Sequence, residues 1–355
     1  MRYAVRRLLI LPLMLVLAAV VFVLLPVVGV VQAVVALGVV AGRRSRWRAL
    51  RLWVFVAVYC AGECLCVLAC LLLWLASPVP RWRNGDRWQA RHVQVLSWYL
   101  GMLMRTAERM IAFRLTLECP RGESIAPDRP VIVLGRHAGP GASLVLIRVL
   151  LRDRGRVPKI VLKEKLRLDP ALDVLLTRIG CAFISAGGAA GAAVTAVAEL
   201  ASQMTCRDAL VLFPEGSDWT PSRHWLAVRR LRRKGMNAQA DAAARTPNVL
   251  PPRPAGTFAA LQAAPAAELA VFMHTGHDEL LDAASIWRAL PLRRELHMVW
   301  WNEPRPDLAS EQECSRWLNH TWVNIDAWIQ EQGDMAEVTQ LRKLQSPRSQ
   351  RTAGE

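Results

Sequence analysis

Two short stretches of this sequence, Arg136-His137-Ala138-Gly139-Pro140-Gly141-Ala142-Ser143 and Phe213-Pro214-Glu215-Gly216-Ser217, decide the fold and locate the site. Each follows an apolar run, Val-Ile-Val-Leu and Ala-Leu-Val-Leu, that is typical of a buried strand. A glycine-containing turn directly after a strand lets the backbone leave the sheet sharply. We therefore expect His137 and Glu215 at the carboxyl ends of two strands, where open α/β sheets bind their ligands.

Strand-like and helix-like stretches alternate through the rest of the chain. Runs that predict strands occur at Arg114 to Glu118, Val131 to Leu134, Lys159 to Leu162, Cys181 to Ser185, Ala209 to Phe213, Glu268 to His274 and Leu296 to Trp301. The stretches between them have mostly helical character. This alternation predicts an α/β fold with a mixed, largely parallel sheet flanked by helices.

The first quarter of the chain contains two long apolar stretches. Residues 8–40 carry no charge, and residues 52–76 carry only Glu63. A helix needs about 20 apolar residues to cross a bilayer core, so both stretches are long enough. The first is too long for the apolar core of a secretory signal, and a second follows it. We therefore expect residues 1–91 to form a membrane anchor with two hydrophobic helical segments.

The arginines around these stretches bear on the topology of the anchor. Basic residues precede the first stretch, lie between the two stretches and follow the second. Two ordinary spans would place the middle group outside, against the positive-inside tendency. A re-entrant hairpin in the first stretch, or two segments that dip into one leaflet, would keep all the arginines on one side. We expect a protein of the cell membrane with its α/β domain on the cytoplasmic face.

The composition also divides the remaining chain. Residues 92–113 combine apolar and aromatic side chains with few charges, which predicts a helix at the membrane interface. Residues 92–332 form the expected α/β domain, and the polar segment 333–355 is expected to be a disordered tail. Within the domain, a basic helical run contains Arg229, Arg230, Arg232, Arg233 and Lys234. A solvated face is the simpler interpretation, and contact with a substrate phosphate or a membrane is the alternative.

The net charge of +16 favours an anionic partner. Beside two apolar segments, anionic head groups explain this charge more simply than nucleic acid does, so we expect membrane lipids as partners and no nucleic acid. Four of the eight cysteines lie within residues 52–76. Packing in a membrane helix is favoured there over metal binding or lipidation. The other four are scattered, as is usual in a reducing compartment.

His137 and Glu215 are the residues that carry the chemistry. An imidazole at the end of a strand can act as a general base, because imidazole ordinarily titrates near working pH. Taken alone, Glu215 would be an exposed glutamate in a Pro/Gly turn. The presence of both motifs after similar strands favours one shared site over two unrelated turns.

These motifs resemble those of the glycerolipid acyltransferases, a family that includes the 1-acylglycerol-3-phosphate acyltransferases. The family's first motif is H-x4-D and its third is F-P-E-G-[ST]; this chain has the third complete and the first without its aspartate. Leu162 to Leu166, leading to Gly180 to Ile184, is similar to the second block. Val249-Leu250-Pro251-Pro252-Arg253 is similar to the fourth block, in the form of the branch with a longer insertion after F-P-E-G. The likeness covers roughly residues 90–330.

The resemblance implies transfer of a fatty acyl group from a thioester to a lysophospholipid such as 1-acylglycerol-3-phosphate, in phospholipid biosynthesis. The donor would be acyl-CoA or acyl carrier protein. His137 would take the proton of the acceptor hydroxyl without a covalent acyl-enzyme, and Glu215 would share the catalytic site. The residues expected to bind substrate are Ser143, Lys163, Phe213, Pro214, Gly216, Ser217 and Arg253. No cofactor or metal is implied, since the acyl donor is a substrate.

Ala142 occupies the position of the motif aspartate, five residues after His137. In an analogous hydrolase triad, loss of the carboxylate that fixes the histidine tautomer costs about 10⁴ in rate. Ser143 could orient the ring without adding charge, and Asp218 could approach the pocket if the two strand ends are neighbours. Three functions remain open: an active acyltransferase, a degenerate relative that binds lipid or thioester without turnover, and a membrane-tethered nucleic-acid binder.

Three other features are interpreted as structural. His274-Thr275-Gly276-His277-Asp278 follows a strand without a further ligand cluster, which favours a turn over a metal site. Gly187-Gly188-Ala189-Ala190-Gly191 lacks the dinucleotide spacing, which favours a tight turn over a phosphate loop. The late tryptophans Trp300, Trp301, Trp317, Trp322 and Trp328 are expected to pack the final helix onto the sheet.

Overall fold

The computed structural model describes residues 2–38, 47–77, 79, 85–119, 126–139, 141–185, 191–278, 280 and 282–345. Of the two terminal helices, side chains are described only for residues 12–31 and 311–333. The glycine-rich stretch 187–190 lies outside the described residues, as do the arginines Arg43, Arg44, Arg46, Arg81 and Arg83 around the apolar segments.

A seven-stranded sheet forms the centre of the molecule, in the order β1-β7-β6-β2-β5-β3-β4. The strands are β1 (Leu115–Glu118), β2 (Val131–Gly135), β3 (Val157–Lys163), β4 (Ala182–Ile184), β5 (Asp208–Leu212), β6 (Glu268–Thr275) and β7 (Leu296–Glu303). All neighbouring pairs are parallel except β6 and β7. The seven strands expected from sequence are confirmed, and so is the mixed, largely parallel sheet.

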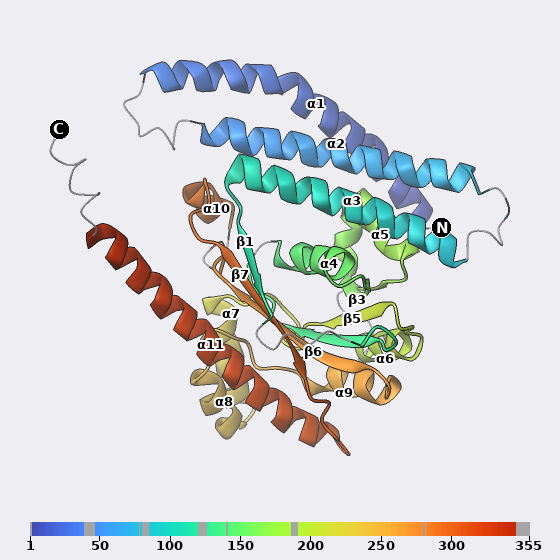
Figure 1. The fold of residues 1–355 in the computed structure, drawn as a ribbon, viewed down its shortest axis with the longest axis vertical. Helices are drawn as coiled ribbons and strands as arrows, with labels where there is room; N and C mark the ends of the chain where they lie inside the picture. The colour runs from blue at the N-terminus through green and yellow to red at the C-terminus, as the bar shows by residue number, and fades with distance from the viewer. Residues whose placement is uncertain are drawn as a thin grey trace.

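Alternate side chains of the central strand β2 define the two faces of the sheet. Val131 and Val133 enter a core with α3 (Asp86–Ile111), α4 (Ala142–Arg152) and α5 (Pro170–Arg178). Ile132 and Leu134 enter a second core with α6 (Ala192–Ser202), α9 (Pro254–Ala263) and α11 (Glu311–Gln345). Figure 1 shows α4 above the sheet and α6 and α9 below it. The strand is buried on both sides, as its unbroken apolar sequence requires.

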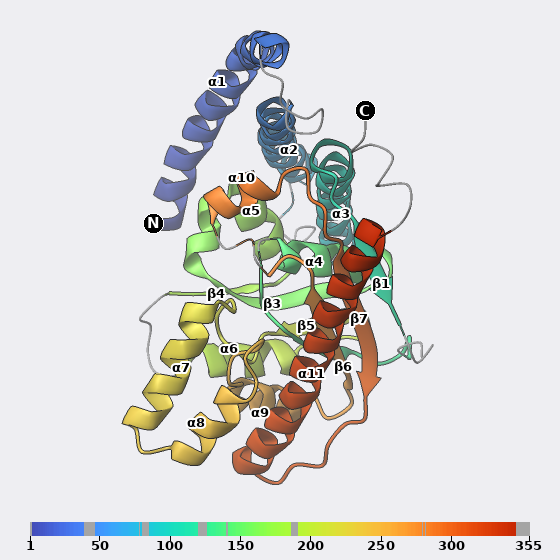
Figure 2. The same ribbon diagram turned by 90° about the vertical axis from the view of Figure 1, so that its left-hand side faces the viewer.

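The remaining helices lie on connections beside the carboxyl ends of the parallel strands. A short 3₁₀ helix (Glu164–Leu168) follows β3, and α7 (Pro221–Arg233) and α8 (Asn237–Ala244) follow β5. The last connection, between β6 and β7, carries α10 (Ala283–Ala289). In Figure 2, α7 and α8 lie on the side of the sheet away from α2, whereas α10 lies toward α2.

Two apolar helices, α1 (Arg2–Gly38) and α2 (Arg48–Leu75), lie on the outer side of the domain, where α2 packs on α3 and α1 packs on α2. Both are long and apolar enough to cross a membrane. Figure 1 shows α1, α2 and α3 running alongside one another. In the described part of α1, 11% of the apolar window is buried, against 33% for α2. The pattern weakly indicates membrane association, with α1 as the more exposed of the two helices.

Glu63 explains why an acidic residue is present in α2. Its side chain is fully buried. The carboxylate accepts hydrogen bonds from the Tyr99 hydroxyl and, at 2.9 Å, from the backbone N–H of Ala171. Nearby, the Tyr59 hydroxyl donates to Asp169 at 2.5 Å. These contacts fasten α2 to α3 and α5, so one face of this apolar helix packs on the α/β domain.

The helix predicted at the membrane interface is present with different bounds, and part of the predicted tail is helical; the location of that helix at an interface stays a prediction. The helix expected at 92–113 begins at Asp86, and its Leu96, Tyr99 and Leu100 are buried in the core. In the segment 333–355, expected to be disordered, α11 continues through Gln345. That extension is rich in Ala, Glu, Gln, Leu, Lys and Arg, which are good helix formers. The lack of apolar periodicity therefore did not predict disorder correctly for residues 333–345. Residues 346–355 lie outside the described residues.

Candidate active site

The two motifs lie side by side because their strands are neighbours. β2 and β5 pair in parallel, with Leu134 opposite Leu212. Beyond the strand ends the pairing resumes as an isolated bridge between Ala138 and Trp219, in which the Trp219 N–H donates to the His137 carbonyl at 2.6 Å. The loop after β5 is thereby held beside the loop that carries His137.

This bridge brings Asp218 to the imidazole. The Oδ1 atom of Asp218 lies 2.6 Å from Nε2 of His137. Hydrogen bonding to His137 is the main cause that lowers the pKa of Asp218 to about 2, with the neighbouring Arg223 acting in the same direction. The carboxylate is therefore ionised at neutral pH, and Nε2 of His137 carries the shared proton.

The other ring nitrogen faces the start of α4. Ser143 Oγ lies 3.5 Å from Nδ1 of His137, at the limit of a hydrogen bond. Ala142 is buried in the first turn of this helix, after Gly141, which adopts a left-handed conformation with φ of 81°. With Nε2 held by Asp218, the neutral ring presents its lone pair from Nδ1, on the side of Ser143.

Phe213 supports the ring from one face. The two rings are stacked, with centroids 4.6 Å apart and planes inclined by 28°. Gly135 lies under Phe213, where a Cβ atom would come within 3.0 Å of the phenyl ring. The carboxylate and this stacking together restrict the position of the imidazole.

Glu215 lies in the interior rather than on the surface of its turn. Its side chain is 2% exposed, and its Oε1 atom accepts a hydrogen bond from Trp322 Nε1 at 3.1 Å. Burial raises the pKa of Glu215 to about 7, although the charge of Arg136 and the Trp322 hydrogen bond oppose the shift. Oε2 is buried without a hydrogen-bond partner among the described residues. Such a group is poised to bind a polar ligand atom.

Arg136 is a buried cation to which the sequence reasoning assigned no role. Its side chain is 1% exposed and forms an ion pair of 2.7 Å with Asp278. The guanidinium also donates to the carbonyls of Asn248, at 2.8 and 3.1 Å, and His274, at 2.8 Å. Arg136 therefore ties the end of β2 to β6 and to the segment before the fourth block. The sequence signal that could have pointed to this role is an arginine directly before His137 at the end of a strand.

Most of the expected substrate-binding residues gather around Glu215. A Cβ on Gly216, whose φ is 71°, would lie 3.2 Å from the Arg253 guanidinium, and the Arg253 N–H donates to the Pro214 carbonyl at 2.9 Å. The third and fourth blocks therefore meet at this turn. Lys163, which belongs to the second block, is exposed at the carboxyl end of β3. It lies at the same edge of the sheet as the turn formed by the third and fourth blocks.

Known proteins share features of this sequence and fold. Residues 117–264, which include both motifs, match the family model described as Acyltransferase. This segment of the chain is thus similar to acyltransferase domains. A solved structure, the 1-acyl-sn-glycerophosphate (LPA) acyltransferase PlsC from Thermotoga maritima, is similar with a TM-score of 0.49 and 12% identity, covering 79% of this chain and 96% of that chain. A search of curated proteins gives no match.

A large cavity opens beside the F-P-E-G turn of the α/β domain. Its volume is about 1060 Å³. Glu215, Ser217 and Arg253 form the inner end, and α7, α8 and α11 form the walls. Lys163 is absent from its described lining. The position of the cavity provides space for a substrate next to the buried carboxylate.

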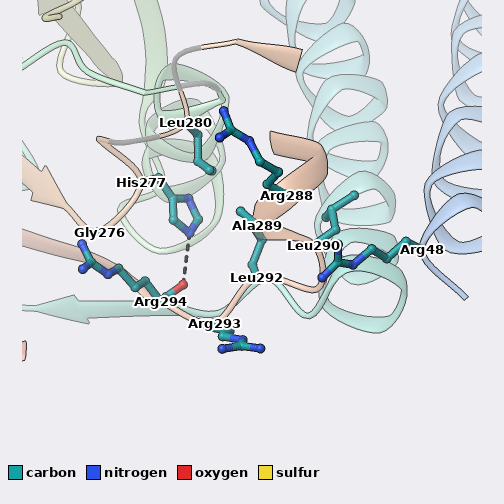
Figure 3. A pocket seen from close by; sticks show the side chains of 10 residues that line it. All are labelled: Arg48, Gly276, His277, Leu280, Arg288, Ala289, Leu290, Leu292, Arg293 and Arg294. Carbon is teal, nitrogen blue, oxygen red and sulfur yellow. Dashed lines mark hydrogen bonds between the residues drawn. The ribbon is translucent and has the colours of Figure 1, made fainter. Parts of the chain in front are cut away.

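A smaller cavity of about 330 Å³ lies on the other side of the loop that follows His137, toward the start of α2 (Figure 3). His277 lines it, and a Cβ on Gly139 would come within 2.8 Å of the His277 carbonyl. The lining also includes the arginines Arg48, Arg288, Arg293 and Arg294. Figure 3 shows these arginines spread around the cavity, so they form a basic rim rather than one anion-binding point.

The histidines at the end of β6 belong to the frame of the α/β domain. Burial lowers the pKa of His274 to about 3, so this ring is neutral. His277 faces the Arg294 carbonyl at 3.2 Å, and Asp278 is engaged by Arg136. Among the described residues, no group of three or more His, Cys, Asp or Glu side chains is placed to hold a metal ion.

Proposed function

We propose that this protein is a membrane-associated enzyme that moves a fatty acyl group from an acyl thioester to a hydroxyl of a lysophospholipid such as 1-acylglycerol-3-phosphate. The observation that carries the proposal is the contact of His137 with Asp218, next to a buried Glu215, inside the segment that matches the acyltransferase family. A base, a carboxylate that orients it and an adjacent cavity are the minimum for such a reaction. Phospholipid synthesis is the pathway that this reaction would serve.

His137 acts as the general base in the proposed mechanism. Asp218 accepts the Nε2–H hydrogen bond and leaves the Nδ1 lone pair to take the proton of the acceptor hydroxyl. The oxygen attacks the thioester carbonyl, and the tetrahedral intermediate collapses with cleavage of the carbon–sulfur bond. The imidazolium returns the proton to the thiolate, which leaves as a thiol. Asp218 stabilises the imidazolium in between, and no cofactor takes part.

The acceptor is held at the inner end of the large cavity. Arg253, above Gly216, is suited to the phosphate of a glycerol-phosphate, and the unpaired Oε2 of Glu215 is suited to accept from a glycerol hydroxyl. Ser143 Oγ, beside Nδ1, can bond the reacting hydroxyl. Phe213, Pro214 and Ser217 shape the turn, and Lys163 contributes charge at the same sheet edge.

The acyl chains of both substrates require a lipid surface. The described part of α1 exposes an apolar side along its length, including Leu13, Val23 and Val30. The basic rim of the smaller cavity lies toward the start of α2, on the side of the site nearest the apolar helices. Both features support membrane lipids as partners, with the α/β domain at the cytoplasmic face.

The test is an acyl-transfer assay of the full chain purified in detergent, with release of thiol and formation of acylated lipid both measured. We expect turnover by the wild type and a loss of at least about 10²-fold in His137→Ala. Thioester and lipid binding without turnover by the wild type would instead establish the degenerate relative. Salt-sensitive nucleic-acid binding that survives His137→Ala together with Glu215→Ala would establish the third function.

A further inference from the structure

The large cavity beside Glu215 has a strongly asymmetric charge. Its described lining contains five cationic side chains, Arg223, Arg230, Lys234, Arg253 and Arg316, and Glu215 as the one acid. Apolar side chains such as Leu226, Met236 and Val323 lie among them. Figure 2 shows the walls: α7 and α8 stand beside α11 on the side of the sheet away from the apolar helices. The ligand that fits this cavity is anionic and partly apolar.

One face of α7 supplies a row of these cations. Arg223, Arg230 and Lys234 are spaced by seven and four residues, so they share a face of the helix, and Leu226 and Leu231 lie beside them. Among the described residues, no carboxylate forms an ion pair with Arg230, Lys234, Arg253 or Arg316. Arg223, at the inner end, pairs with Asp218 at 3.3 Å. The row thus begins at Arg223, the partner of the carboxylate that contacts His137, and continues with cations that have no such partner among the described residues.

The length of this row distinguishes the two substrates. From Arg223 to Lys234 the helix rises by about 16 Å, at 1.5 Å per residue. In a lysophospholipid such as 1-acylglycerol-3-phosphate, the phosphate is attached to the carbon next to the reacting hydroxyl, so its charge must lie close to His137. In a coenzyme A thioester, by contrast, a long uncharged pantetheine arm separates the reacting carbonyl from three phosphates. Cations far from His137 match the second arrangement.

We propose that the cavity between α7, α8 and α11 binds the phosphate-bearing end of a nucleotide thioester of the coenzyme A type. Arg230 and Lys234 hold the phosphates, and the apolar wall accommodates the adenine and the pantetheine arm. This assignment rests on the proposed function, since it makes the ligand of the cavity the acyl donor. It selects a nucleotide thioester over an acyl carrier protein, whose one prosthetic phosphate is attached to a folded protein.

The experiment measures binding of coenzyme A itself, by calorimetry, to the full-length His137→Ala protein, so that no turnover occurs. In that background, Arg230→Glu with Lys234→Glu is expected to raise the dissociation constant for coenzyme A at least about tenfold. The matched control, Arg229→Glu with Arg233→Glu, makes the same charge change on the same helix at residues that do not line the cavity. We expect the control to change the constant less than about threefold, and thermal unfolding checks that both variants fold.

Three outcomes overturn the assignment. Equal losses in both double variants would mean that α7 attracts coenzyme A only through its general charge. Weakened binding of 1-acylglycerol-3-phosphate with unchanged binding of coenzyme A would assign Arg230 and Lys234 to the acceptor instead of the donor. If the wild type transferred acyl groups from acyl carrier protein while coenzyme A did not bind, the proposed function would stand and this inference would fail. If coenzyme A bound in the cavity but the wild type did not transfer acyl groups, this inference would stand and the proposed function would fail.

Discussion

Asp218 reaches His137 from the loop that follows β5, with its carboxylate 2.6 Å from the Nε2 atom of the imidazole. The position of the motif carboxylate, five residues after the histidine on the same loop, is occupied by the buried Ala142. Ser143, the next residue, is the one whose side chain approaches Nδ1. Asp218 therefore holds the ring at Nε2, and in the proposed mechanism Nδ1 accepts the proton.

Asp218→Asn is expected to lower the rate of acyl transfer by about 10² to 10⁴, because an amide favours the wrong tautomer and does not stabilise the imidazolium. The rate of thiol release at saturating substrates measures this. Arg223→Gln is the control, since it removes the other partner of Asp218 without touching His137. A similar rate in Asp218→Asn and the wild type would show that the carboxylate has no part in the reaction.

Restoring the motif aspartate is expected to bring no gain in either of two backgrounds. In Asp218→Asn, the added change Ala142→Asp places a carboxylate at Nδ1, the nitrogen that takes the proton in the proposed mechanism, and leaves Nε2 facing the amide, so the rate should not recover. In the wild type, Ala142→Asp places the imidazole between two carboxylates, which favours its charged form and removes the base at neutral pH. The rate should then fall and recover as pH rises. An Ala142→Asp protein with higher activity than the wild type would show that Asp218 orients the ring poorly.

Glu215→Gln is expected to stabilise the protein at alkaline pH. The folded pKa of about 7 lies above the ordinary value of 4.5, so the contribution of the protonated carboxyl to stability is complete below pH 4.5 and is lost as pH rises through 7. The neutral amide avoids this loss, so the gain in the free energy of unfolding should approach about 3 kcal/mol at pH 8 and be small at pH 5. Urea unfolding at the two pH values measures it, with the exposed Glu199→Gln as a control. An equal effect at both pH values would contradict the raised pKa.

Glu63→Ala is expected to loosen α2 from the domain. The substitution leaves the Tyr99 hydroxyl and the Ala171 N–H buried without their acceptor, at a cost of roughly 1–3 kcal/mol for each group. Cys66, fully buried where α2 meets the core, should then react faster with a thiol reagent. Mass spectrometry of the labelled peptides in detergent measures the rate, with the exposed Cys119 as a reference. Unchanged labelling of Cys66 would show that apolar packing alone holds the helix.

The strands could be predicted from sequence because their burial leaves a direct trace. Residues 131–134 and 209–212 are apolar at every position, as a strand covered on both sides must be, and the turns after them contain glycine. The ends of the helices were less predictable. In α11, residues that are good helix formers extend the helix beyond its apolar, periodic part. In α3, the first turn is polar, so the apolar pattern did not indicate that the helix begins at Asp86.

The site was only partly visible in the sequence. His137, Glu215, Gly216 and Arg253 could be assigned from their motifs, and the structure brings the last three together. Whether Asp218 reaches His137 depends on which strands are neighbours and on their register, which local patterns do not encode. Trp322 was assigned to packing, and its hydrogen bond to Glu215 has no local signal, because the two residues meet only when α11 lies across the sheet.

The bridge between Ala138 and Trp219 makes the contact of His137 with Asp218 a property of the complete sheet. The imidazole and the carboxylate come from segments that only the pairing of β2 with β5 aligns, and a slip of one residue would move Asp218 by about 3.3 Å, out of reach of the imidazole. No fragment that holds only one of these strands can assemble the pair. Activity is thus a sensitive reporter of strand register, and an inactivating substitution far from His137 in either strand is first to be tested for its effect on that alignment.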